Sequence, residues 1–138
     1  SDMALPSPYL INRVLNQRGA DLIENLFYEE NKMKQFVLVY LGGNQPSSPE
    51  EAKKHFSKYM EWLSSLGDAV VIPTIPLKDT NTVSPDGTIG EGGSSQMSGF
   101  SIIKAESMED ALAIAQDCPF LEIDGSLEVS EMMQMPAQ

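Results

Sequence analysis

The single histidine, His55, is the side chain in this sequence best suited to moving a proton. Histidine titrates close to neutral pH, so it can serve as a general acid or a general base. On a helical wheel of about 100° per residue, His55 lies at the edge of an apolar stripe, beside Tyr59 and Trp62. The same position suits a structural histidine that bonds a carbonyl group or a water molecule. His55 is therefore a candidate site residue with a structural alternative.

The other positions that could carry chemistry predict no metal and no cofactor. Cys118 precedes Pro119 and has no histidine nearby in sequence, so we expect a buried small hydrophobe rather than a nucleophile. The glycines over 87–93 suggest a phosphate-binding loop, but no lysine and no helix follow, and we expect a flexible loop over 90–98. The acids over 106–131 lack the spacing of a calcium loop and predict a solvated acidic surface.

The charge balance argues against several classes of partner. The 138 residues include 20 acids and 9 bases, for a net charge of −11. This surplus repels phosphate backbones and anionic lipids, so we expect no nucleic-acid partner and no membrane binding. The apolar runs are far shorter than the roughly 18 residues of a membrane helix, and no signal-peptide pattern opens the chain. One cysteine excludes an intrachain disulfide, and we expect a soluble, cytoplasmic protein.

Three segments have the apolar spacing of amphipathic helices. We expect residues 8–30 to form one or two helices broken at Gly19, and residues 49–66 to form the helix that carries His55. A third, shorter helix spans 107–117 and begins at a capping-box pattern. These helices must position the candidate site.

The strands are predicted from apolar and β-branched runs between turn signals. Residues 36–41 are apolar on both alternating faces, and Pro73 and Pro76 confine the run 69–72 to a sheet edge. The remaining predicted strands are 82–83 and 88–89, which flank a turn, and 100–105 and 127–129. The order is then β-α-β-β-β-α-β, or β-α-β-β-α-β if the hairpin at 82–89 only decorates a loop. The second order is the split βαβ, ferredoxin-like α+β fold.

This fold leaves one face of its sheet without helices. Because 36–41 is apolar on both sides, that face carries large hydrophobic side chains, which a single chain cannot cover. We therefore expect a homodimer that packs sheet face against sheet face. We divide the chain into an N-terminal helical extension at 1–32, in which Ser1 and Asp2 are interpreted as added residues, and a compact domain at 33–138.

An ordered set of short motifs over roughly 33–131 resembles the YCII-related family. The motifs are Met33 to Tyr40, Ser48-Pro49-Glu50-Glu51, Gly67, Ser84-Pro85-Asp86-Gly87, Ser98-Gly99-Phe100, Glu109-Asp110-Ala111-Leu112, Cys118-Pro119 and Glu128-Val129. The resemblance implies a dimeric α+β barrel of two ferredoxin-like sheets. Two features depart from the pattern: the helical arm before Met33, and Gly90 to Ser95 in place of an Asp-Gly-Pro-Phe segment that many members carry.

The resemblance also implies a partner for the histidine. Some members have a histidine on this helix with an aspartate considered for acid–base work, and Asp68 is the nearest matching acid here. We expect a ligand pocket lined by four aromatic residues: Tyr40, Tyr59, Trp62 and Phe100. Two functions follow. The first is a non-catalytic module that binds a small ligand or a partner, and the second is a small cofactor-free enzyme (an isomerase, lyase or peroxidase-like catalyst) that uses His55 with Asp68.

Overall fold

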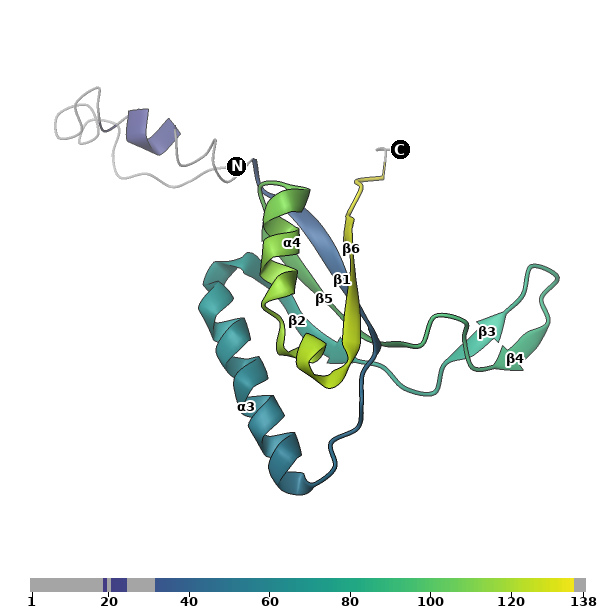
Figure 1. The fold of residues 1–138 in the computed structure, drawn as a ribbon. Helices are drawn as coiled ribbons and strands as arrows, with labels where there is room; N and C mark the ends of the chain where they lie inside the picture. Colours follow the sequence, from purple (N-terminus) through teal and green to yellow (C-terminus); the bar gives the residue numbers. More distant parts are fainter. Residues whose placement is uncertain (1–18, 20, 25–31, 136–138) are drawn as a thin grey trace, which may run out of the picture. The chain divides into compact units, whose positions relative to one another are not determined.

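The structure is a computed structural model that describes residues 19, 21–24 and 32–135 (Figure 1). The chain divides into two compact units, Ser1–Met33 and Lys34–Gln138. In the first unit, residues 19 and 21–24 are helical. The expected helical arm at 8–30 lies largely outside the described residues, so its docking stays a prediction.

The second unit begins with a strand, a helix and a second strand. These are β1 (Lys34–Gly42), α3 (Pro49–Leu66) and β2 (Val70–Pro76), with the short 3-10 helix η1 (Gly67–Ala69) before β2. Helix α3 starts where expected, because the Ser48 side chain accepts a hydrogen bond from the Glu51 amide and Pro49 occupies the first turn. It ends at Gly67, whose φ of 53° is open to glycine without strain.

The rest of the unit contains a hairpin, a strand, a helix and a last strand. The hairpin pairs β3 (Asn81–Val83) with β4 (Ile89–Glu91), and it is followed by β5 (Met97–Ala105) and α4 (Met108–Gln116). The 3-10 helix η2 (Pro119–Ile123) and strand β6 (Gly125–Glu131) complete the unit. The flexible loop expected over 90–98 is shorter than predicted, because Gly90 pairs with Thr82 in the hairpin and β5 already begins at Met97.

The main sheet has the strand order β2-β5-β1-β6. Its three pairings are all antiparallel, and the hairpin forms a separate two-stranded sheet that Figure 1 shows projecting from the unit. With the hairpin set aside, the order along the chain is β-α-β-β-α-β, which confirms the ferredoxin-like α+β fold. Strand β2 lies at a sheet edge, where its two prolines are tolerated.

The core lies between the two helices and one face of this sheet. Phe36 and Leu38 of β1 are fully buried there, and Trp62 of α3 and Ala111 of α4 pack against the same cluster. The opposite face carries the alternate residues of the central strands, which are only half-buried. No helix among residues 32–135 is long and apolar enough to cross a membrane, and the cytoplasmic location stays a prediction.

Candidate functional site

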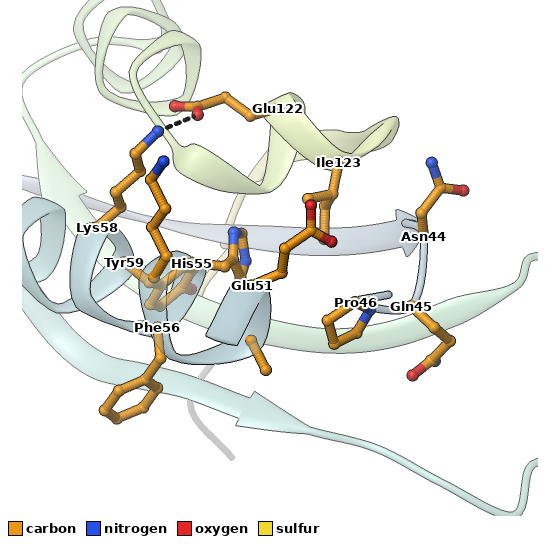
Figure 2. A pocket seen from close by; sticks show the side chains of 12 residues that line it. Asn44, Gln45, Pro46, Glu51, His55, Phe56, Lys58, Tyr59, Glu122 and Ile123 are labelled. Carbon is orange, nitrogen blue, oxygen red and sulfur yellow. Dashed lines mark hydrogen bonds and ion pairs between the residues drawn. The ribbon is translucent and has the colours of Figure 1, made fainter. Parts of the chain in front are cut away.

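A cleft of about 600 Å³ opens beside the first half of α3. One wall is α3 itself, and the others are the loop after β1 and the 3-10 helix η2 (Figure 2). The lining combines five apolar or aromatic residues with four charged ones, two amides and a histidine. The lining residues are Asn44, Gln45, Pro46, Glu51, Ala52, Lys54, His55, Phe56, Lys58, Tyr59, Glu122 and Ile123.

Local hydrogen bonds hold the start of α3 in place at the edge of the cleft. The Ser47 amide donates to the Glu51 carboxylate over 3.1 Å, and the Ser47 hydroxyl donates to the same oxygen. These two donors hold the pKa of Glu51 below its ordinary value. The Glu51 carboxylate is thus ionised and already engaged by the protein.

The wall formed by η2 depends on two glycines. The ring of Phe120 packs so closely on the backbone that a Cβ atom at Gly43 would lie 2.7 Å from the ring, and one at Gly125 2.1 Å from it. The Asn44 amide donates to the Ile123 carbonyl over 2.7 Å, which ties the loop after β1 to η2. Two walls of the cleft, the loop after β1 and η2, are therefore hydrogen-bonded to each other.

An ion pair connects the helix wall to the η2 wall. The Lys58 ammonium donates to the Glu122 carboxylate at 2.9 Å, and both side chains are about half-exposed (Figure 2). An exposed pair of this kind adds little stability. Its consequence for the cleft is that the charge of Lys58 is already balanced.

His55 lines the cleft and is half-buried, with its ring 6.3 Å from that of Tyr59. The Tyr59 hydroxyl is used elsewhere, because it donates to the Tyr40 hydroxyl over 2.6 Å and also bonds Thr74. Tyr59 therefore contributes its ring to the cleft rather than its hydroxyl.

Beneath the cleft, four hydroxyl groups form a cluster between α3 and the sheet. Tyr40 bonds Thr74 over 2.9 Å and Ser101 over 3.1 Å, and Tyr59 contacts both Tyr40 and Thr74. Each hydroxyl has one hydrogen to donate. All four contacts are satisfied if Tyr59 donates to Tyr40, Tyr40 to Thr74, Thr74 to Tyr59 and Ser101 to Tyr40.

Burial raises the pKa of both tyrosines in this hydroxyl cluster, so both stay protonated at physiological pH. Sequence reasoning missed the cluster as a unit. The available signal was Ser101, a polar residue inside an otherwise apolar strand, which is 1% exposed.

The structure separates several residues that the sequence analysis grouped. Asp68 is exposed and lies beyond the end of α3, and at about 1.5 Å of rise per residue that end alone is about 16 Å along the helix from His55. The two are not brought together, and no proton can pass directly between them in this arrangement.

Of the four expected pocket aromatics, only Tyr59 lines the cleft. Tyr40 is buried in the hydroxyl cluster, and the Trp62 indole donates to the Ile114 carbonyl inside the core over 3.3 Å. Phe100 pairs with Val39 on the opposite face of the sheet. Because successive side chains of a strand point to opposite faces of the sheet, Phe100 and Tyr40 lie on different faces.

Cys118 is buried, and burial raises the pKa of its thiol to about 11. The thiol is thus protonated and shielded, as a packing residue would be. Among the described residues, no group of three or more His, Cys, Asp or Glu side chains could hold a metal ion.

The chain is similar to a known protein family and to solved structures. The family model described as "YCII-related domain" matches residues 33–136. A solved 5-chloro-2-hydroxyhydroquinone dehydrochlorinase from Burkholderia phenoliruptrix AC1100, in complex with 2,5-dihydroxybenzoquinone, is 16% identical, with a TM-score of 0.48. The alignment covers 73% of this chain and 95% of that one. Comparison with curated proteins gave no match.

Proposed function

The chain belongs to the family of YCII-related domains, and from the geometry of its cleft we propose that it binds a small molecule between α3 and η2. The volume of about 600 Å³ lies in the range of about 300–1,000 Å³ typical of small-molecule sites. Such sites combine apolar walls with a few placed polar groups. Here Pro46, Tyr59 and Ile123 contribute apolar surface, and His55 contributes a polar ring nitrogen.

The observation that carries the proposal is the position of His55 beside Tyr59 in this cleft. The imidazole can donate or accept one hydrogen bond, while the aromatic ring next to it offers a flat surface. That pair can both orient a ligand and bury its apolar part.

The proposal is tested by filling the cleft. Ala52 lines the cleft, so Ala52→Phe should block it, whereas Ala113→Phe adds the same ring at an exposed position of α4. A screen of small aromatic fragments by two-dimensional NMR should shift the amide signals around His55 in the parent protein and in Ala113→Phe, but not in Ala52→Phe. Binding that survives Ala52→Phe, or that shifts only residues outside the cleft, would contradict the proposal.

Binding is favoured over the alternative of a small cofactor-free enzyme. The expected partner Asp68 lies at the other end of α3, and the carboxylates that do line the cleft, Glu51 and Glu122, are bonded to Ser47 and Lys58. An acid–base catalyst requires a group that orients the histidine or shares its proton. Among the described residues, His55 has no such carboxylate available.

We further propose that the chain forms a homodimer through the open face of its sheet. Val39 and Phe100 pair directly on that face, and Val37 pairs with Ile102 beside them. These side chains are half-buried although no described helix covers them. An apolar face of this kind is typical of a protein interface. In a dimer with a two-fold axis, this face of one copy packs against the same face of the other.

The homodimer is tested with two variants, one with a negative charge on the open face of the sheet and one with a negative charge on the helical side of the domain. Val39→Asp places a carboxylate on the open face, and Leu112→Asp places one on the exposed side of α4, which is 46% exposed. Light scattering at micromolar concentration should give a dimer for the parent and for Leu112→Asp, and a monomer for Val39→Asp. A monomeric parent protein would overturn the dimer.

A further inference from the structure

One stretch of α3 carries a third of the positive charges of this acidic protein. Three of the 9 bases, Lys53, Lys54 and Lys58, lie within six residues of one another, in a chain whose net charge is −11. Lys54 and Lys58 are one helical turn apart and both line the cleft, whereas Lys53 does not. The cleft is therefore a local exception to the negative surface.

The two lysines and the two carboxylates that line the cleft sum to zero formal charge, but only one of the lysines is held in an ion pair. Glu122 neutralises Lys58 through the ion pair at 2.9 Å. The Glu51 carboxylate is held by the amide and the hydroxyl of Ser47. Within the part of the chain that the structure describes, no carboxylate lies within ion-pair distance of the Lys54 nitrogen, although its positive charge helps to lower the pKa of Glu51. Lys54 is thus the cation of the cleft that no carboxylate among the described residues holds in an ion pair.

We infer that the cleft takes a small organic monoanion, namely a carboxylate on a flat apolar body, and that Lys54 binds its charged group. The inference rests on the proposed small-molecule function and specifies the class of its ligand. A single unpaired ammonium matches one negative charge, and the two carboxylates nearby would repel a dianion. The Glu51 amide already donates to the Ser48 side chain and the Ser47 amide to the Glu51 carboxylate, and the lysine brings the full positive charge that an anion needs.

The apolar part of the ligand has a defined place. The Tyr59 ring and the Ile123 side chain lie on opposite walls of the cleft, and His55 lies next to Tyr59 (Figure 2). A flat ring between these walls brings its carboxylate to the rim, where lysine side chains keep their charge in water. His55 can then donate a second hydrogen bond to the same anion.

Benzoate and benzamide are the probes for this inference. They have almost the same shape, but only benzoate is charged, so their affinities separate the charge from the apolar body. The matched variants are Lys54→Gln and Lys53→Gln, which remove the same charge from adjacent exposed residues of α3. Two-dimensional NMR titration of the full chain gives the dissociation constant and the location of each probe.

We expect benzoate to bind in the cleft about fivefold more tightly than benzamide, as an exposed ion pair permits. Lys54→Gln should remove that advantage and leave benzamide unaffected, and Lys53→Gln should keep it. Equal affinities for the two probes in the parent protein, or equal losses in the two variants, would overturn the anion preference while cleft binding stands. If neither probe shifts the cleft residues while other fragments of the screen do, the inference fails and the proposed function stands; if no fragment does, both fail.

Discussion

Removing the Tyr40 hydroxyl tests whether the hydroxyl cluster beneath the cleft stabilises the contact between α3 and the sheet. Tyr40 makes three of the four hydrogen bonds in the cluster, to Tyr59, Thr74 and Ser101. Tyr40→Phe removes those three bonds and leaves the shape of the ring unchanged. Its ring contact with Phe120, at 5.1 Å between centroids, should survive.

The expected cost follows from what the substitution leaves behind. A buried hydrogen bond contributes about 1 kcal/mol net, and a buried polar group left without a partner costs about 1–3 kcal/mol. Tyr40→Phe leaves Ser101, which is 1% exposed, without its hydroxyl partner, whereas Thr74 and Tyr59 still bond each other. We expect a loss of about 2–3 kcal/mol in the free energy of unfolding for Tyr40→Phe, and about 1–2 kcal/mol for Tyr59→Phe.

The assay is urea denaturation of the two single variants and of the double variant. Because the two tyrosines share one bond, the double variant should cost about 1 kcal/mol less than the sum of the single losses. A loss below about 0.5 kcal/mol for Tyr40→Phe, or strict additivity, would refute the view that the cluster acts as one hydrogen-bonded unit.

Three further predictions concern the histidine, the η2 wall and pH. His55→Ala should cost less than about 1 kcal/mol of stability because the side chain is only half-buried, and a loss near 3 kcal/mol by denaturation would make the residue structural. Gly125→Ala should lower stability by about 2–3 kcal/mol, since its Cβ would lie 2.1 Å from the Phe120 ring, whereas Gly90→Ala meets nothing within 4 Å and should have little effect on the melting temperature. Burial raises the pKa of the Cys118 thiol from 9.0 to about 11. Between these two pH values the folded protein keeps the thiol proton and the unfolded chain loses it. The resulting contribution to the free energy of unfolding, on the order of 2 kcal/mol, should therefore be complete below pH 9 and lost between pH 9 and 11. Urea midpoints that do not fall over that interval, or that fall equally in Cys118→Ala, would contradict this account.

The fold could be predicted because its signals are local. Each helix is indicated by a short stretch of sequence that contains its N-cap residue and its apolar stripe. The N-caps are Ser48 and Ser107, and both helices begin directly after them. The apolar alternation of β1 on both faces likewise indicates a central strand, which the strand order confirms. Such patterns depend only on backbone periodicity.

The site was harder to predict because it depends on residues far apart in sequence. Glu122 and Ile123 reach the cleft only through η2, a short 3-10 helix that ends at Asp124 in the left-handed conformation, with a φ of 64°. Nothing local to His55 indicates that η2 lies opposite it. The family resemblance implies Asp68 as the partner of His55, but the straight helix α3 separates the two residues.

The strand order also has a consequence for the way the chain is made. Strand β1 lies between β5 and β6. The backbone groups on both of its edges therefore stay unpaired until these two later segments have emerged from the ribosome. At about 5–20 residues per second, synthesis of the intervening chain takes several seconds. Until then a strand that is apolar on both faces has no partner, which exposes it to aggregation. We therefore expect the sheet to close only after β6, the last of its strands along the chain, has left the ribosome.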